Sequence, residues 1–267
     1  MFTDKVIIIT GSTQGIGFKV AELLAERGAK VIINSRREEK VKAALEKLKN
    51  TTTRVAGLAG DVSDEAFCRV LCQFAITQFG QLDILINNAG IAAGGLIKDT
   101  RGEAFKKVID INLLGSLYPT LACMTEICKQ KGSVLFIGSV AGIAGLPSYS
   151  AYSSSKRGLV SIAESLRAEL WDEGVFVGIH YPGFTENEDD KIMLNTSGRE
   201  EVLKKRDGVK AQSRDQTAGR IIKQLEKRKF RMFSSFSAAA VYRFYHISPG
   251  FFLRMLILFR KKIISMQ

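Results

Sequence analysis

Short apolar runs alternate with longer amphipathic stretches along most of the chain. Six runs, most of them rich in β-branched side chains, predict strands at 6–10, 30–34, 54–58, 82–87, 133–138 and 175–180. The stretches between them have helical periodicity and predict helices at 15–27, 38–49, 64–78, 101–129 and 151–172. Strands that alternate with helices and are apolar on both sides predict an α/β fold, a Rossmann-type doubly wound parallel sheet with helices on both faces.

The chain length of 267 residues suits one large domain with a full core. We expect residues 1–235 to form that domain, ending near a short strand at 230–233, and residues 236–267 to form a C-terminal extension. The polar segment 184–212 lacks clear periodicity, and we expect it to be mobile and to lie over the functional site. In a doubly wound sheet, that site lies at the carboxyl ends of the strands.

A glycine-rich turn links the first predicted strand to the first predicted helix. Its sequence is Thr10-Gly11-Ser12-Thr13-Gln14-Gly15-Ile16-Gly17. Glycines allow a tight turn and close approach of a phosphate, and a helix N-terminus offers free N–H groups to an anion. The alternative is a tight turn that binds nothing. We expect the turn to contact a dinucleotide through Gly11, Ser12, Thr13, Gly15, Ile16 and Gly17.

The end of the second predicted strand favours one form of the dinucleotide. An acidic residue at this point would bind the adenosine ribose hydroxyls and repel a 2′-phosphate. The chain has Arg36 and Arg37 instead, with Lys40 close behind, and these cations can pair with a phosphate. We therefore predict NADP(H) in preference to NAD(H). A solvated basic start to a helix is the alternative interpretation.

One predicted helix carries a pair of residues suited to proton transfer. Tyr152 and Lys156 are four positions apart and so share a face. A free tyrosine has a pKa of about 10, and a nearby ammonium favours its phenolate. Tyr152 can thus give a proton to a carbonyl or take one from an alcohol. Ser139 lies thirteen residues earlier, directly after a predicted strand.

The G-x-x-x-G-x-G spacing after a threonine, together with Tyr-x-x-x-Lys, resembles the short-chain dehydrogenase/reductase family over residues 3–235. The resemblance implies that Ser139 binds the substrate oxygen, that Tyr152 and Lys156 also contact the cofactor, and that Asn112 ties a water to Lys156. It further implies cofactor contacts at Asp61, Val62, Asn88, Ala89, Gly90, Pro182, Gly183 and Thr185. The family places a threonine slightly later, where this chain has Asn187.

A closer resemblance concerns the substrate. The segments 111–119 and 151–156, with Arg36 and Lys40, look like the 3-ketosphinganine reductase branch. This implies NADPH-dependent reduction of a hydrophobic, lipid-like ketone at a membrane. A hydroxysteroid or small-alcohol dehydrogenase of the same family is the alternative, and a non-catalytic cofactor-binding scaffold is a third.

The net charge of +12 is concentrated near the C-terminus. Residues 227–267 hold nine Lys or Arg and no Asp or Glu, which leaves +3 for the rest of the chain. A basic, aromatic segment without a long apolar run suits peripheral contact of 236–267 with anionic lipids. A cap on the core or on a subunit interface is the alternative. The low remaining charge gives no reason to expect nucleic acid.

Other features predict an intracellular enzyme without metal. The four cysteines and two histidines lack metal-ligand spacing, so we expect no metal site and buried thiols in a reducing compartment. A core strand starts at once after Lys5, so no signal peptide is expected. We expect a cytoplasmic homo-oligomer, a dimer or tetramer, in solution or on the cytoplasmic face of a membrane. His180 falls inside a strand and is predicted to be structural.

Overall fold

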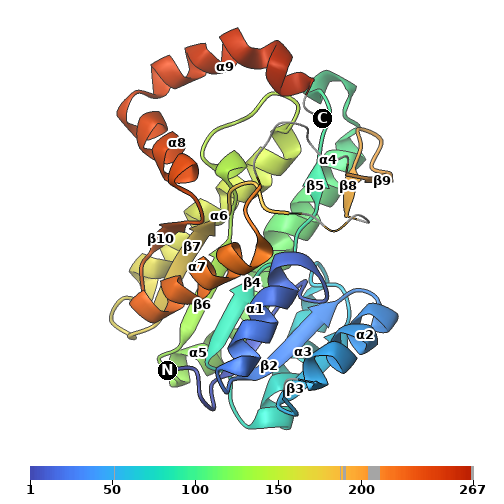
Figure 1. Ribbon diagram of the computed structural model, residues 1–267, viewed down its shortest axis with the longest axis vertical. Coiled ribbons are helices and arrows are strands. Elements are labelled where there is room, and N and C mark those ends of the chain that lie inside the picture. Colours follow the sequence, from blue (N-terminus) through green and yellow to red (C-terminus); the bar gives the residue numbers. More distant parts are fainter. Residues whose placement is uncertain (51, 187, 189–190, 204–210, 266–267) are drawn as a thin grey trace.

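A seven-stranded parallel sheet forms the centre of the computed structural model, which describes residues 1–50, 52–186, 188, 191–203 and 211–265 (Figure 1). The strand order is β10-β7-β6-β4-β1-β2-β3, so the order reverses beside β1. The strands are β1 (Val6–Ile9), β2 (Lys30–Ser35), β3 (Val55–Ala59), β4 (Ile84–Asn87), β6 (Ser133–Ile137), β7 (Phe176–Tyr181) and β10 (Arg231–Phe233). Each predicted strand is present, with ends that differ by at most two residues.

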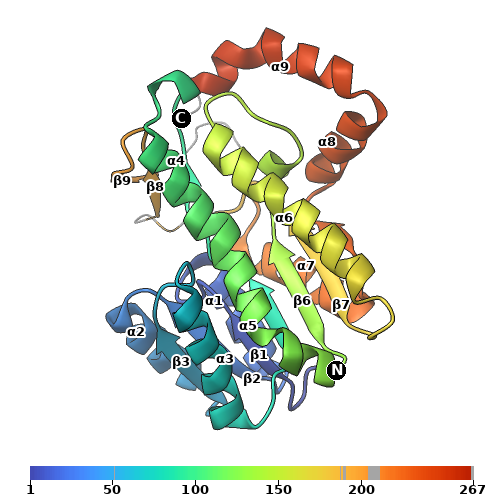
Figure 2. The ribbon, with the colours of Figure 1, turned by 180° about the vertical axis from the view of Figure 1, so that it is seen from behind.

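Helices cover both faces of this sheet. One face carries α1 (Gly15–Glu26), α2 (Glu38–Lys49) and α7 (Arg214–Lys227), and the other carries α3 (Glu65–Phe79), α5 (Gly115–Lys129) and α6 (Ser150–Glu169) (Figures 1 and 2). Along β1, Ile7 and Ile9 pack in the core of the first face, and Val6 and Ile8 in the core of the second. Side chains therefore alternate between two apolar cores, which is why these strands are apolar throughout. The predicted fold class is confirmed.

A continuous helical stretch leads into α5. It consists of α4 (Gly102–Ile109), a π-helical turn (Asp110–Leu114) and α5 itself. Within the described part of the chain, only Gly102–Lys129 is long and apolar enough to cross a membrane. Its α5 portion packs against α3 and β4 at the sheet.

A second, smaller sheet lies beyond the carboxyl edge of the first. It joins β5 (Ala92–Ala93), β8 (Ile192–Leu194) and β9 (Glu200–Val202), with a 3₁₀ turn at Ile97–Asp99. The sequence predicts no strand in 184–212, and this is wrong for β8 and β9. They form because β5 offers its backbone to β8 and because Leu194 is fully buried. Residues 187, 189–190 and 204–210 lie outside the described residues.

Two helices, α8 (Phe236–Ile247) and α9 (Pro249–Ile264), end the chain. Helix α8 packs on the sheet through Tyr242, whose ring lies 5.8 Å from that of Tyr181 and 5.1 Å from that of Phe233. Helix α9 runs across the top of the molecule (Figures 1 and 2). None of the side chains of α9 is buried.

The four cysteines are free thiols, and Cys68, Cys72 and Cys123 are buried while Cys128 is half-buried. Burial raises the pKa of Cys68 to about 12 and that of Cys128 to about 11, so both stay protonated. Among the residues that the structure describes, no three His, Cys, Asp or Glu side chains gather to hold a metal ion.

Candidate active site

The predicted site residues meet at the carboxyl edge of the main sheet. Thr10, directly after β1, accepts hydrogen bonds at Oγ1 from the N–H groups of Asn88 and Ala89, each 3.0 Å long. These bonds join the glycine turn to the loop after β4. The carboxyl ends of neighbouring parallel strands thus carry the candidate residues on one edge, as a doubly wound sheet requires.

Glycine occupies the three positions of the turn for different structural reasons. A Cβ on Gly17 would lie 2.3 Å from Asn88 Nδ2, and one on Gly11 would lie 2.7 Å from the Ala89 Cα. Gly11 and Gly15 have left-handed φ values of +59° and +61°. A Cβ on Gly15 would meet nothing within 4 Å. Gly11 and Gly17 therefore allow close packing, while the position that a side chain would occupy on Gly15, at the start of α1, is open.

Two predicted cofactor residues hold the turn together through their side chains. Ser12 is fully buried; its hydroxyl donates to the Ile9 carbonyl and accepts from the Asn34 N–H. The Asn88 amide donates to the carbonyls of Thr10 and Gly11 at 2.9 and 2.8 Å. Their side chains shape the turn from within. Thr13 and Ile16 are half-buried on it.

The loop after β4 connects the glycine turn to the proton-transfer pair. A Cβ on Gly90 would lie 3.1 Å from Asn112 Oδ1 and 3.2 Å from Lys156 Nζ. Glycine is thus the residue that lets the loop pass this close to both side chains. Residues 88–90 therefore contact the turn at one end and Lys156 at the other.

Lys156 is buried beside Tyr152. Its Nζ donates to the Ile137 carbonyl at 3.0 Å and lies 5.9 Å from the centre of the Tyr152 ring. Burial, and to a lesser extent the positive charge of Lys191, lowers the pKa of Lys156 to about 8. A lysine ammonium that titrates this close to neutrality beside a tyrosine is suited to move protons.

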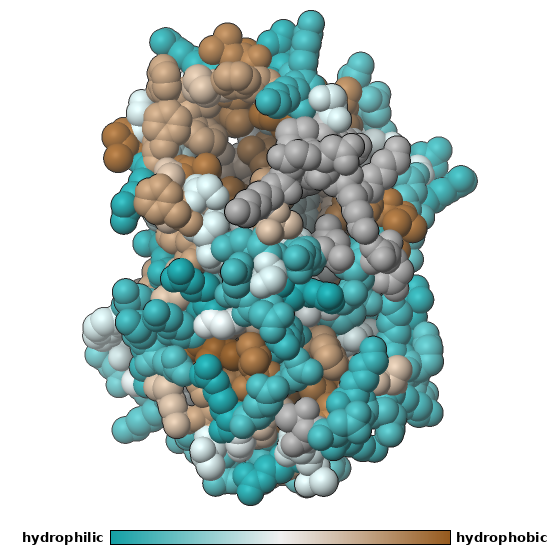
Figure 3. Space-filling model, viewed as in Figure 1, coloured by the Kyte–Doolittle hydropathy of each residue, from teal (hydrophilic) through white to brown (hydrophobic). Residues whose placement is uncertain are grey.

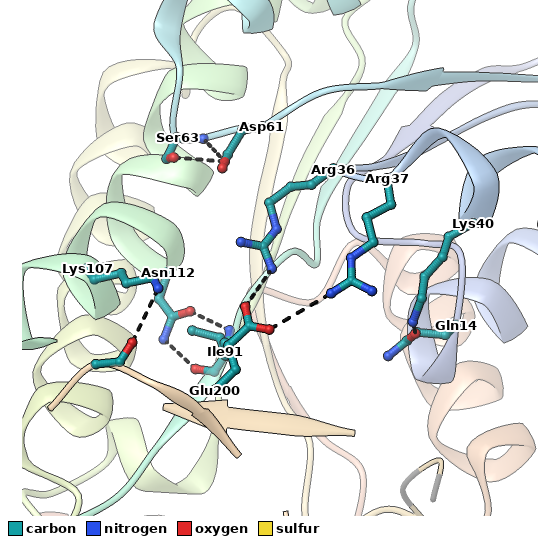
Figure 4. Close-up of polar contacts among 11 residues, drawn as sticks. Gln14, Arg36, Arg37, Lys40, Asp61, Ser63, Ile91, Lys107, Asn112 and Glu200 are labelled. Atoms are coloured by element: carbon teal, nitrogen blue, oxygen red, sulfur yellow. Dashed lines mark hydrogen bonds and ion pairs between the residues drawn. The ribbon is translucent and has the colours of Figure 1, made fainter. Parts of the chain in front are cut away.

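Asn112 lies in the π-helical turn, a feature that is often found at functional sites. Its Oδ1 accepts from the Ile91 N–H at 2.7 Å, and its Nδ2 donates to the Ile91 carbonyl at 3.0 Å (Figure 4). The Nδ2 also donates to Ser155 Oγ at 3.0 Å. The side chain thus ties the loop after Gly90 to α6. The predicted link from Asn112 to Lys156 through a water stays a prediction.

Ser139 follows β6 and starts a 3₁₀ turn (Val140–Gly142). Its Oγ accepts from the Ala141 N–H at 3.2 Å. A Cβ on Gly142 would lie 2.9 Å from the Lys156 backbone, so this turn packs directly on the part of α6 that carries Lys156. The structure therefore brings Ser139, Tyr152 and Lys156 to the same end of the sheet.

Three cations stand next to the glycine turn. Arg36 and Arg37 both face the carboxylate of Glu200, at 3.6 and 3.9 Å, and Lys40 donates to the Gln14 side chain at 2.8 Å (Figure 4). The sequence predicts the three cations but gives no signal for Glu200, which lies on a strand that it did not predict. Its contact with the cations arises from the pairing of β9 with β8.

Asp61 has a local partner. One carboxylate oxygen accepts from the N–H and the hydroxyl of Ser63, at 2.9 and 2.8 Å, in a turn after β3 (Figure 4). Val62 is buried, and its carbonyl accepts from the Cys68 thiol. Both residues lie at the carboxyl edge, as predicted, although this oxygen of Asp61 shapes its own turn.

The segment after β7 points toward α7. Thr185 donates to the Gly183 carbonyl at 3.3 Å and shares a hydrogen bond with Thr217 at 3.1 Å, and Gly183 packs close to Ser235. Pro182 is half-buried. Asn187 lies outside the described residues.

His180 is structural, as predicted. It is fully buried, and its two ring nitrogens bond to Gln224 and Ser234 at 2.7 and 2.8 Å. Burial lowers its pKa to about 4, so the ring stays neutral.

The sheet order and the edge described above define a Rossmann-type fold. Residues 5–194 match the short chain dehydrogenase family, and the chain belongs to this family of short-chain dehydrogenases/reductases. An uncharacterized oxidoreductase of Thermotoga maritima is 38% identical over 206 residues, which cover 76% of this chain and 81% of that protein. The predicted family and enzyme class, an oxidoreductase acting on CH–OH donors, are confirmed.

Other relatives have named activities. A 3-oxoacyl-[acyl-carrier-protein] reductase of Rickettsia prowazekii is 37% identical over 76% of this chain and 81% of its own length. An 11-beta-hydroxysteroid dehydrogenase-like protein (4A) of Arabidopsis thaliana is 37% identical over 68% of this chain and 62% of its own length. Among solved structures, a short-chain dehydrogenase/reductase from Burkholderia phymatum in complex with NAD has a TM-score of 0.81 at 23% identity, covering 94% of this chain and 95% of that one. The similarity to this solved structure is a similarity of fold alone.

Proposed function

We propose that this enzyme interconverts a ketone and a secondary alcohol with NADP(H), and that its substrate is lipid-like. One observation carries the proposal: the buried Lys156, whose Nζ lies 5.9 Å from the centre of the Tyr152 ring, packs beside Gly90, at the far end of the loop that holds the glycine turn. The proton-transfer pair and the expected dinucleotide turn are thus joined by three residues of backbone.

The residues present fit a dinucleotide. The bare backbone at Gly15 and the first-turn N–H groups of α1 suit a pyrophosphate, because no acidic side chain lies in that turn. Arg36, Arg37 and Lys40 suit a 2′-phosphate. No acid ends β2, where Asn34 instead donates to the carbonyls of Leu58 and Gly60.

The chemistry divides between cofactor and protein. The nicotinamide supplies or accepts the hydride. In reduction, the Tyr152 hydroxyl donates its proton to the ketone oxygen; in oxidation, the Tyr152 phenolate takes the proton from the alcohol. The Lys156 ammonium stabilises that phenolate, and the Ser139 hydroxyl, which accepts from the Ala141 N–H, can still donate to the substrate oxygen.

The substrate class is supported by a cavity of about 660 Å³ under α9. Its lining is mainly apolar, with Leu146 and Pro147 on one side and Leu253, Leu256 and Ile257 on the other. Apolar side chains surround a hollow in this region (Figure 3). Such a space suits an acyl chain or a steroid better than a small polar ketone.

The cavity and the proton-transfer pair occupy different faces of α6. Ser150, Ser153 and Ser154 line the cavity, whereas Lys156 points to the sheet. We propose that the apolar part of the substrate lies in the cavity and that its carbonyl reaches Tyr152 around the first turn of α6, beside the loop 145–147.

The test of the chemistry is the oxidation of NADPH and NADH in the presence of ketones. The wild-type protein is expected to prefer NADPH, and Tyr152→Phe is expected to lose at least about a hundredfold in turnover because the proton donor is gone. Tyr149→Phe, three residues earlier at the start of α6, is the matched control and keeps its activity. Equal turnover by all three proteins would refute the assignment of Tyr152.

The test of the substrate is a panel of 3-ketosphinganine, ketosteroids and short ketones. We expect a long-chain keto lipid to be reduced best. A ketosteroid is the second candidate, because relatives named 11-beta-hydroxysteroid dehydrogenase or 11-beta-hydroxysteroid dehydrogenase-like are similar to most of the chain. Efficient reduction of short polar ketones alone would refute the lipid-like class.

We further propose that α8 and α9 contact an anionic membrane surface from the cytoplasmic side. Phe251, Leu258 and Phe259 are at least half exposed on α9. The two helices carry five Arg or Lys and no acidic residue. Exposed aromatic and aliphatic side chains beside cations suit the interface of a bilayer that contains acidic lipids.

A further inference from the structure

Two carboxylates of the segment after β7 lie against the groups that are expected to hold the cofactor's phosphates. Glu200, on β9, faces Arg36 and Arg37 at 3.6 and 3.9 Å (Figure 4). Glu188 accepts from the Gly15 N–H at 3.4 Å and pairs with Arg214. One carboxylate thus meets the expected 2′-phosphate position, and the other meets the expected pyrophosphate position.

The position of Glu200 is fixed by the small sheet. It pairs with Leu194 across β8 and β9, and Leu194 is fully buried. β8 in turn pairs with Ala92 and Ala93, shortly after the loop that contacts both the glycine turn and Lys156. The backbone at Glu200 is therefore held in register beside the cofactor loop, unlike that of a freely moving surface loop.

A carboxylate and a phosphate compete when they need the same guanidinium groups. Arg36 and Arg37 each have about half of their side chain exposed, and Glu200 about a third, so their attraction is partly screened but not lost. A 2′-phosphate that bound both arginines would also stand within a few ångströms of the Glu200 carboxylate. The two anions repel, so Glu200 must weaken the binding of that phosphate or move away from it.

We infer that Glu200 is a specificity-determining residue that lowers the affinity for NADP(H) relative to NAD(H), and that Glu188 lowers the affinity for both. This inference rests on the proposed NADP(H) site. Only NADP(H) carries the 2′-phosphate, whereas both cofactors carry the pyrophosphate. Glu200 is therefore expected to change the affinity for NADP(H) alone, and Glu188 the affinity for both cofactors. By weakening ground-state binding of the cofactor, they speed its release after each turnover.

The test is equilibrium binding of NADPH, NADH and adenosine 2′,5′-bisphosphate, followed by fluorescence or calorimetry. Glu200→Gln is expected to bind NADPH and the bisphosphate about three- to tenfold more tightly, with NADH within about twofold of wild type. Glu188→Gln is expected to tighten NADPH and NADH alike. Glu201→Gln, the neighbour on β9, removes the same charge without touching either arginine and is the matched control.

The outcomes separate this inference from the proposed function. Wild-type protein that binds neither dinucleotide would refute both. Wild-type protein that binds NADPH, with no tighter binding by Glu200→Gln or with the same gain for NADH, would refute the role of Glu200 and leave the proposed function intact. Glu200→Asp retains the charge on a shorter side chain, so its NADPH affinity should lie between those of Glu200→Gln and wild type. An affinity outside that interval would also contradict the proposed role of Glu200.

Discussion

Lys156 shows how burial sets the chemistry of a single residue. Its ammonium has lost nearly all contact with solvent, and one carbonyl, that of Ile137, accepts its hydrogen bond at 3.0 Å. Burial is the largest cause of its lowered pKa of about 8, and Lys191 is the second. The ammonium is therefore charged at neutral pH and loses its proton as the pH rises through about 8.

This titration predicts a pH profile. The charged form of Lys156 stabilises the Tyr152 phenolate, so kcat/KM for the ketone, which reports ionisations of the free enzyme, should fall above about pH 8. In Lys191→Gln a repelling charge is gone, the pKa of Lys156 rises, and the fall should move to higher pH. Lys191→Arg retains the charge and should match wild type. A profile that is identical in all three proteins would contradict this account.

The glycine turn gives a prediction about packing. Gly17→Ala would force its Cβ against Asn88 and should lower the free energy of unfolding by about 1–3 kcal/mol and weaken NADPH binding. Gly219→Ala, in α7, meets nothing within 4 Å and should be neutral or slightly stabilising. Urea unfolding and NADPH titration measure both effects. Equal behaviour of the two variants would show that the turn tolerates a side chain.

At the level of residues, the sequence spacing was enough to predict that Tyr152 and Lys156 lie on one face of a helix, because residues at i and i+4 of a helix share a face. It could not show that the hydroxyls of Ser12 and Thr185 bond within the protein. Which way a hydroxyl points depends on neighbours that are distant in sequence. Glu200 was missed for the same reason, since its partners are more than 160 positions away.

At the level of elements, the pattern predicted every strand of the main sheet, because burial on both faces leaves a continuous apolar run. It did not predict β8 and β9, which have three residues each and owe their existence to β5. The π-helical turn at Asn112 was also missed, because no particular residue composition marks the wider hydrogen bonding of a π-helix. Asn112 is held in this turn by its hydrogen bonds to Ile91 and Ser155.

Helix α9 has two apolar sides, and this predicts separate roles for neighbouring residues. Leu256 lines the cavity, whereas Leu258 is 71% exposed and does not. Leu256→Gln should raise KM for a long-chain ketone by about tenfold, because a polar group enters the apolar cavity, and leave the values for short ketones unchanged. Leu258→Gln should leave all of these kinetic constants unchanged. Equal effects of the two substitutions on KM would contradict the placement of the substrate under α9.

At the level of the whole molecule, the uneven charge predicts where the enzyme binds. With nine cations and no acid in residues 227–267, the protein should float with vesicles that contain phosphatidylserine and not with vesicles of phosphatidylcholine alone. Binding should weaken at high salt and in Leu258→Gln, while Leu256→Gln binds as wild type does. Absence of flotation, together with a dimer held through α9 in sedimentation, would show that this surface binds a second copy instead.

In the proposed reaction, a bound nicotinamide would exchange a hydride with the ketone carbon, and Tyr152 would supply the proton to the ketone oxygen. The most direct measurement uses NADPH deuterated at the transferable position of its nicotinamide, a long-chain ketone and mass spectrometry of the product. We predict an alcohol that carries one deuterium on the former carbonyl carbon with wild type and Tyr149→Phe, and almost none with Tyr152→Phe. An undeuterated alcohol from wild type, or an equal yield of deuterated alcohol from Tyr152→Phe, would contradict the claim.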